Sequence, residues 1–259
     1  MKTTQSNGLA IAYLDEGEGP PVLLVHGFAS NHMMNWRVTS WFASLSGAGF
    51  RAIALDCRGH GKSGKPHDPA AYAPALMADD LLAVLDAEGV RRTAVFGYSM
   101  GARIALEALM AAPGRFACAV LGGVGENLLK PPGNGEALAA ALEADEIPED
   151  ASATAREFRG FAERTFSDRK ALAACMRGQR VAVDPERLAR LDVPVLVAAA
   201  MEDRIAGPAG PLAEAIPGAA THLVASDDHM RVIGMPAYKA GILAFLEEHA
   251  GVPTGTGRR

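Results

Sequence analysis

The stretch Gly97-Tyr98-Ser99-Met100-Gly101 indicates most directly how this chain folds. An apolar run at 93–96 precedes it, and a helix-forming run at 102–108 follows it. A serine at a sharp turn from a strand into a helix is held in a strained conformation with its hydroxyl exposed. Side chains at the two glycine positions would clash where the strand and the helix approach each other. The pattern therefore predicts that Ser99 is a nucleophile at the end of a buried strand.

Short apolar runs alternate with amphipathic segments along most of the chain. The runs predict strands at 9–14, 22–25, 52–55, 93–96, 117–121, 193–199 and 221–225, and the segments predict helices at 36–48, 74–88, 99–111, 211–215 and 236–249. From residue 22 onward the strands are apolar throughout, as is typical of a parallel sheet buried on both faces. The alternation predicts an α/β fold with a doubly wound, mostly parallel sheet.

Residues 126–191 interrupt this alternation. They contain loop-like clusters at 130–135 and 147–150 and helical stretches at 136–146, 151–166, 168–177 and 184–191. The segment is too long for an ordinary loop, so we expect a helical cap at 126–191 on a core formed by 1–125 and 192–250. The alternative is a peripheral helical layer without substrate contact. The tail 251–259 is rich in Gly, Pro and Thr, which predicts disorder.

Composition limits the classes of partner. The chain has 259 residues, of which 49% are hydrophobic, enough for a large core. Its net charge is −5 with scattered basic residues, which argues against a nucleic-acid partner. No apolar run approaches the ~20 residues of a membrane span. The start lacks the apolar core of a signal peptide, and three dispersed cysteines fit a reducing compartment. These features predict a cytoplasmic protein with a small-molecule substrate and leave its oligomeric state open.

A nucleophilic serine needs a base within hydrogen-bond reach and an acid that orients the base. Among seven histidines we favour His229, which follows the predicted strand 221–225 and would lie at the same sheet edge as Ser99. We favour Asp203 as the acid because it follows the predicted strand 193–199. Glu126, just past the strand 117–121, is the alternative acid.

The oxyanion of an acyl-transfer reaction needs backbone N–H donors. Met100 supplies one from the start of its helix, and Phe28, in the loop after the strand 22–25, supplies the other. We interpret His26 as a hydrogen-bonding residue that shapes this loop. Phe28 and Met100 are also candidate substrate-binding residues. Three further apolar residues either line a pocket or pack the core, namely Met33, Met34 and Trp36.

The segment Asp56-Cys57-Arg58-Gly59-His60-Gly61-Lys62-Ser63 follows another buried strand. Its two glycines and its polar side chains predict a fixed, hydrogen-bonded loop. Asp56 and His60 could ligate a metal, but no third ligand is spaced to complete the site. We therefore expect no metal and no cofactor.

Together these motifs resemble the α/β-hydrolase family. His26-Gly27 after an early strand, the Asp56–Ser63 motif, the turn around Ser99, and Asp203 followed by His229 stand in the family's order. The resemblance covers about residues 8–249 and implies a serine-nucleophile esterase-like member with a helical cap. Two positions depart from the family pattern, because Ala200 and Asp228 stand where glycine is frequent.

Related epoxide hydrolases and haloalkane dehalogenases carry aspartate at the position of Ser99, so the resemblance to them does not extend to the nucleophile. A serine implies a carboxylic-ester hydrolase that forms an acyl-enzyme with a small or medium apolar acyl group. Three alternatives remain open: a carbon–carbon bond hydrolase, a perhydrolase with the same triad, and a slow-turnover receptor for small molecules.

Overall fold

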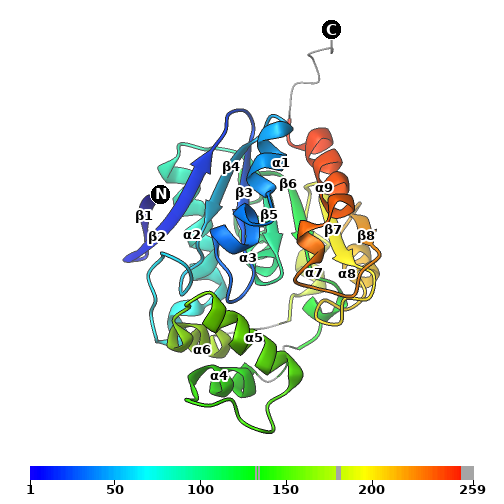
Figure 1. Ribbon diagram of the computed structural model, residues 1–259. Helices are drawn as coiled ribbons and strands as arrows, with labels where there is room; N and C mark the ends of the chain where they lie inside the picture. The colour runs from blue at the N-terminus through cyan, green and yellow to red at the C-terminus, as the bar shows by residue number, and fades with distance from the viewer. Residues whose placement is uncertain (132, 134, 179–181, 252–259) are drawn as a thin grey trace.

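A sheet of eight strands runs through the middle of the molecule in the computed structural model, which describes residues 1–131, 133, 135–178 and 182–251 (Figure 1). The strands are β1 (Lys2–Ser6), β2 (Leu9–Glu16), β3 (Pro21–Val25), β4 (Arg51–Leu55), β5 (Thr93–Tyr98), β6 (Phe116–Gly122), β7 (Val195–Ala200) and β8 (Ala220–Val224). Their order is β1-β2-β4-β3-β5-β6-β7-β8. The β1–β2 and β2–β4 pairs are antiparallel, and every later pair is parallel. The predicted α/β fold with a mostly parallel sheet is thus confirmed.

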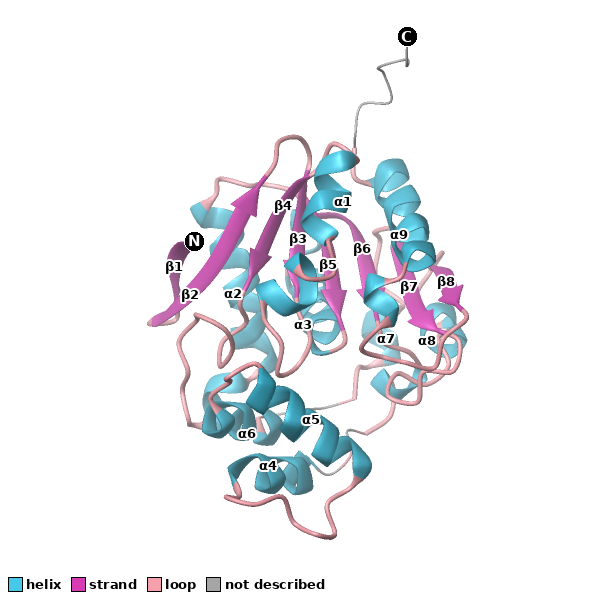
Figure 2. Ribbon diagram, in the orientation of Figure 1, coloured by secondary structure: helices cyan, strands magenta, loops and turns pink. Residues whose placement is uncertain are grey.

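Each face of the sheet is covered by helices (Figure 2). Successive residues of β3 alternate between the two layers: Leu23 and Val25 pack with α2 (Pro74–Ala87), α3 (Met100–Ala111) and α8 (Gly210–Glu214). Val22 and Leu24 pack with α1 (Trp41–Gly47) and α9 (Pro236–His249) on the other face. Because every central strand is buried on both faces, its residues must be apolar without interruption.

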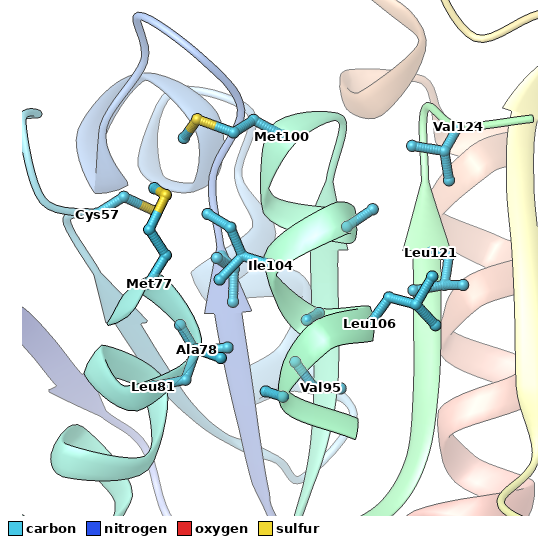
Figure 3. Packing of buried hydrophobic residues seen from close by; sticks show 14 of the residues in the cluster. Cys57, Met77, Ala78, Leu81, Val95, Met100, Ile104, Leu106, Leu121 and Val124 are labelled. Carbon is cyan, nitrogen blue, oxygen red and sulfur yellow. The ribbon is translucent and has the colours of Figure 1, made fainter. Parts of the chain in front are cut away.

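Figure 3 shows part of the first layer, in which side chains of α2 and α3 pack against the strands. Met77 and Leu81 of α2 lie beside Ile104 of α3, and Val95 comes from β5 below them. Met100 stands at the upper end of α3, where the chain has just left the sheet. This packing fixes the start of α3 relative to β5.

The topology places a crevice beside β3 and β5. After β3 the chain moves to one side to form β4, and it then returns to the other side of β3 to form β5. Loops that leave the carboxyl ends of two such strands diverge, and ligands bind in the resulting gap in open α/β sheets. The loop after β3 carries Phe28, and the turn after β5 carries Ser99.

Three helices of the segment between β6 and β7 gather beyond the carboxyl ends of the parallel strands (Figure 1). They are α4 (Gly135–Glu143), α5 (Ala153–Arg164) and α6 (Arg169–Arg177). The Ser152 hydroxyl caps α5 by accepting from the Ala155 amide, and Asp168 caps α6 in the same way. The shorter α7 (Pro185–Leu188) is close to α3 through Arg187 and Glu107.

Short helical turns complete the described chain. A π-helical turn spans Met33–Arg37, and 3₁₀ turns span Pro69–Tyr72, Pro113–Arg115, Glu126–Leu128 and Val232–Gly234. No helix within the described ranges is both long enough and apolar enough to cross a lipid bilayer.

Two sequence predictions differ from the structure. The single helix predicted at 36–48 is wrong, because Ser40 adopts a left-handed conformation, with φ of 64°, that separates the π-helical turn from α1. Strand β1 was not predicted, because its residues are mostly polar and exposed. The predicted disordered tail 251–259 lies outside the described residues except for Gly251, and so does part of the predicted loop 130–135.

Candidate active site

Ser99 occupies the turn between β5 and α3 with φ of 53° and ψ of −112°. A Cβ atom added at Gly97 would lie 2.3 Å from the Gly101 carbonyl oxygen. One added at Gly101 would lie 2.0 Å from the Val25 carbonyl oxygen. Only glycine fits at either position, for the steric reason expected from the sequence. The Ser99 amide donates to the Gly122 carbonyl at 2.7 Å, which fastens the turn to β6.

The side chains of Ser99, His229 and Asp203 form one hydrogen-bonded chain. His229 Nε2 lies 3.1 Å from Ser99 Oγ, and His229 Nδ1 lies 2.7 Å from Asp203 Oδ2. An ionised carboxylate only accepts, so Nδ1 carries the proton and Nε2 is free to accept from the serine hydroxyl. This arrangement can remove the serine proton while the carboxylate stabilises the imidazolium that forms.

The Asp203 carboxylate is held on both of its oxygens. Oδ1 accepts the amides of Ile205 at 2.9 Å and Ala206 at 3.0 Å, which leaves Oδ2 for the imidazole. Ala200, where the family often has glycine, is the last residue of β7 and lies buried ahead of this turn. Asp228 accepts the amides of Met230 and Arg231 and thereby caps the turn that carries His229.

Tyr98 supports the imidazole from below and was not predicted as a site residue. Its hydroxyl donates a hydrogen bond to the carbonyl oxygen of His229, and the two rings are 5.4 Å apart. Burial is the main cause that raises the pKa of Tyr98 well above its ordinary value, so the phenol stays protonated. No sequence pattern predicts this contact, because it forms only where the end of β5 meets the loop after β8 in space.

The amides of Phe28 and Met100 are available for an oxyanion. Neither donates to another group within the described part of the chain. His26 fixes the peptide that carries the Phe28 N–H, since its Nδ1 donates to the Gly27 carbonyl at 2.7 Å. His26 Nε2 accepts from the Cys57 amide at 2.9 Å, so the ring bridges two loops. Burial, the main cause, lowers the pKa of His26, and the ring acts as a neutral hydrogen-bonding group.

The loop after β4 is fixed by buried hydrogen bonds, as predicted. Asp56 accepts the backbone N–H and the Nδ1 of His32, both at 2.8 Å, and the amide of Lys62 at 2.7 Å. Burial opposes ionisation of Asp56, but the hydrogen bonds from His32 hold its pKa below the ordinary value. The Ser63 hydroxyl donates to the Asp56 carbonyl at 2.5 Å.

His60 lies in the same loop and contacts the site through ring packing. Its Nδ1 donates to the Arg58 carbonyl at 2.9 Å, and its ring stands edge-on to Phe28 at 5.7 Å. Burial is the main cause that lowers its pKa to about 3, so the ring is neutral near pH 7. Within the described ranges no group of three or more His, Cys, Asp or Glu residues is arranged to hold a metal ion.

A cavity of about 220 Å³ opens above Ser99 and His229. Phe158 and Phe161 of α5 line this cavity, and the Phe28 ring packs edge-on against Phe158 with the ring centres 5.5 Å apart. The other lining residues are Gly27, Ser30, Met34, Asn35, Val38, Thr39, Tyr98, Met230 and Ile233. No Asp, Glu, Lys or Arg side chain is among these lining residues. The cavity therefore suits an uncharged, largely apolar ligand.

The remaining candidates lie in different places. Glu126 pairs with Lys130 at 2.7 Å, whereas Asp203 is the carboxylate that touches His229. Met100 lines a separate cavity of about 30 Å³ with Cys175, and its sulfur is 3.9 Å from the Cys175 thiol. Met34 lines the larger cavity, Trp36 packs in the core, and Met33 is exposed.

Similar solved structures match nearly the whole chain. A hydrolase from Pseudomonas aeruginosa superposes with a TM-score of 0.77 and 26% identity over 95% of this chain and 97% of its own. Est816, described as an N-acyl homoserine lactone degrading enzyme, superposes with a TM-score of 0.74 and 25% identity over 94% and 99%. The enol-lactonase from Burkholderia xenovorans shares the fold at 20% identity, with a TM-score of 0.78 and 95% and 99% coverage.

Curated relatives match over a shorter stretch. An epoxide hydrolase from Caballeronia sordidicola is 37% identical over 111 residues, which cover 43% of this chain and 33% of the relative. Epoxide hydrolase B from Mycobacterium tuberculosis is 38% identical over 88 residues, 34% of this chain and 24% of the relative. The matched stretch thus spans a third or less of these relatives. A sequence model described as the alpha/beta hydrolase fold matches residues 20–183, so the chain belongs to the α/β hydrolase family.

Proposed function

We propose that this protein is a serine hydrolase that cleaves small or medium carboxylic esters through an acyl-enzyme. The observation that carries the proposal is the continuous hydrogen-bond chain from Ser99 Oγ through His229 to Asp203, at 3.1 and 2.7 Å. It faces a cavity of neutral, mostly apolar residues. These features match the requirements for acyl transfer to a serine.

In the proposed mechanism His229 Nε2 takes the Ser99 proton as Oγ attacks the ester carbonyl carbon. The amides of Phe28 and Met100 stabilise the resulting oxyanion. His229 then returns the proton to the leaving alcohol, and the carbon–oxygen bond breaks to give the acyl-enzyme. A water molecule, deprotonated by the same imidazole, attacks the acyl carbon and releases the acid with regeneration of Ser99.

The nucleophile argues against the epoxide chemistry named for the curated relatives. A carboxylate that opens an epoxide forms an ester, which water can hydrolyse. A serine that opened an epoxide would form an ether, which this site could not hydrolyse, and the enzyme would stop after one turnover. An ester or a lactone instead returns Ser99 to its starting state. The lactone-degrading activity described for Est816 supports the same bond type.

The test is a turnover assay with p-nitrophenyl esters of increasing acyl length. We expect multiple turnovers on short and medium chains, and loss of turnover in Ser99→Ala. Parallel assays with a 1,3-diketone and with peroxide plus a carboxylic acid measure carbon–carbon cleavage and perhydrolysis. Faster turnover in either of these, or ester binding without release of p-nitrophenol, would overturn the proposal in favour of the corresponding alternative.

A further inference from the structure

Asn35 contacts the loop that carries the Phe28 amide. It belongs to the π-helical turn Met33–Arg37, and its side chain lines the cavity above Ser99 although only 7% of the residue is exposed. Its Oδ1 accepts the Gly27 amide at 3.1 Å. Such π-helical turns are frequent at functional sites. The motifs around Ser99 do not predict this contact, because Asn35 lies eight residues beyond Gly27.

The Asn35 hydrogen bond completes a two-sided anchor on Gly27. Asn35 Oδ1 holds the peptide before Gly27 through its N–H at 3.1 Å. His26 Nδ1 holds the peptide after Gly27 through its C=O at 2.7 Å. Glycine is the residue whose two backbone rotations are least restricted, so fixing both flanking peptide planes removes that freedom. In a trans peptide the N–H points opposite to the C=O, and these anchors therefore set the direction of the Phe28 N–H.

Asn35 itself is held firmly enough to act as an anchor. The backbone N–H of Asn35 donates to the Asn31 carbonyl at 3.0 Å, and the backbone carbonyl of Asn35 accepts the Thr39 hydroxyl at 2.5 Å. The side-chain Nδ2 is buried and has no hydrogen-bond partner within the described residues. Leaving a buried donor unpaired costs about 1–3 kcal/mol. Because the unpaired Nδ2 does not favour stability, the placement of Oδ1 explains an asparagine at this position better than stability does.

We propose that Asn35 is a positioning residue of the oxyanion hole. Its Oδ1 holds the Gly27 amide so that the Phe28 N–H is aimed at the carbonyl oxygen of a substrate bound above Ser99. This inference rests on the proposed acyl-enzyme mechanism. Since the Phe28 amide strengthens its contact as negative charge develops, loss of the anchor affects the transition state more than substrate binding.

Asn35→Ala tests the proposal against a matched control, Asn31→Ala. Asn31 lies in the same loop, and its Oδ1 also accepts one backbone amide, that of Met34 at 3.0 Å. In Asn35→Ala we expect kcat to fall about 10²-fold, the loss typical of one oxyanion donor, with KM within about threefold of wild type. Asn31→Ala should change kcat less than about threefold on the same reasoning.

Inhibitor affinity supplies the second readout. A trifluoromethyl ketone adds Ser99 to form a hemiketal whose oxyanion occupies the same site, whereas the corresponding methyl ketone reports ground-state binding. We expect Asn35→Ala to weaken the binding of the trifluoromethyl ketone in proportion to the loss of kcat and to leave the affinity for the methyl ketone unchanged. If Asn35 only lined the cavity, Asn35→Ala would instead raise KM and weaken the binding of both ketones.

The outcomes separate this inference from the proposed function. If wild type forms no acyl-enzyme at Ser99, the mechanism fails as a whole. If wild type acylates Ser99 and Asn35→Ala keeps a kcat near wild type, only the role of Asn35 is overturned. Thermal unfolding checks that each variant is folded. Should Asn35→Ala not fold, Asn35→Ser replaces it, because its hydroxyl is one bond too short to take the place of Oδ1.

Discussion

At the scale of single residues, backbone geometry determines where the Ser99 hydroxyl lies. The positive φ of Ser99 is a conformation that costs a non-glycine residue about 1–3 kcal/mol, and the turn between β5 and α3 imposes it. The hydroxyl is thereby presented to His229 Nε2 at 3.1 Å. Alanine at this position would keep the same backbone and lose only the hydroxyl.

Ser99→Ala should therefore abolish turnover without unfolding the protein. We expect kcat to fall by at least about 10⁴-fold, because removing the nucleophile of a comparable triad has an effect of this size or larger. The midpoint of thermal unfolding should stay within about 2 °C of wild type, since no core contact is lost. Ester hydrolysis and circular dichroism measure the two quantities, and activity near that of wild type would exclude Ser99 from the mechanism.

Asp203→Asn should lower kcat by about 10⁴-fold, because an amide would favour the wrong tautomer of His229. Glu126→Gln is the matched control, since Glu126 was the alternative acid and pairs with Lys130 on the surface. It should retain kcat within about threefold, as exposed ion pairs contribute little. Steady-state kinetics of both variants provide the measurement, and the opposite ranking would assign the orienting acid to Glu126.

At the scale of elements, helix α5 lines the cavity and contacts the loop after β3. Phe158 packs edge-on against the Phe28 ring at 5.5 Å, and the Thr165 hydroxyl, just beyond α5, lies 3.3 Å from the Ala29 carbonyl. The predicted helical segment 126–191 thus supplies part of the cavity lining through Phe158 and Phe161. We retain its role as a substrate-covering cap as a proposal.

Phe158→Ala should shift the preferred acyl length upward. Removing the ring enlarges the cavity without touching Ser99, so longer esters should gain kcat/KM relative to short ones. One extra methylene accommodated in an apolar pocket typically changes kcat/KM by about 10-fold. The ratio of rates on butyrate and octanoate esters measures the shift. An unchanged ratio would show that the chain of the substrate does not occupy this part of the cavity.

A buried ion pair ties the loop after β4 to α2. Arg58 donates to both oxygens of Asp80 at 2.6 and 2.7 Å and also to the carbonyls of Ala71 and Leu76. Both side chains are buried, and burial is the main cause that raises the pKa of Asp80 above its ordinary value.

Asp80→Ala should destabilise the fold by about 3–5 kcal/mol, because it leaves the guanidinium buried without its counter-charge. The double variant Arg58→Met with Asp80→Ala should be less destabilised than Asp80→Ala alone, since no unpaired charge remains. Urea unfolding of the three proteins gives the free energies. A double variant less stable than Asp80→Ala would mean that the backbone contacts of Arg58 outweigh the unpaired charge.

The elements differ in how well the sequence predicts them. The central strands β3 to β7 are predictable because strands buried on both faces must be continuously apolar. Strand β1 was not predicted because an edge strand pairs through its backbone, and side chains such as Thr3 and Gln5 can therefore be polar. The break in the predicted helix at Ser40 was not predicted either, because a single left-handed residue does not change the hydrophobic periodicity.

The site was predictable where its residues sit at strand ends and not where they meet only in space. Ser99, Asp203 and His229 each follow a parallel strand, so topology alone brings them to one sheet edge. Tyr98 and Asn35 contact the His229 carbonyl and the Gly27 amide, and no sequence spacing predicts these contacts. The side chain of Met100 was expected near the substrate, but helix α3 turns it toward Cys175.

At the scale of the whole molecule, a charged network joins the start of the chain to the sheet and to α2. Arg51 donates to both oxygens of Asp15 at 2.7 and 2.9 Å and to Glu88 at 2.8 Å, and Lys2 contacts the same two carboxylates. The hydrogen bond from Arg51 is the main cause that holds the pKa of Asp15 below its ordinary value.

Asp15 should therefore contribute to stability at neutral pH and lose that contribution in acid. A depressed folded-state pKa stabilises the fold above the unfolded value of about 3.9, and this stabilisation disappears as the pH falls through the folded value. Asp15→Asn should be less stable than wild type at pH 7, and the difference should begin to shrink as the pH falls below about 3.9 and keep shrinking with further acidification. Urea midpoints at pH 7, 5, 4 and 3 measure it, and a difference independent of pH would refute the electrostatic account.

The proposed mechanism requires an acyl group bound covalently to Ser99, which intact-protein mass spectrometry can detect. Wild type quenched in acid during hydrolysis of a p-nitrophenyl ester should gain the mass of one acyl group, and peptide mapping should locate that group on Ser99. Asp203→Asn should form the same adduct more slowly, and Ser99→Ala should form none. Sustained ester turnover by Ser99→Ala, or an acyl group on any other residue of the active wild type, would rule out Ser99 as the nucleophile.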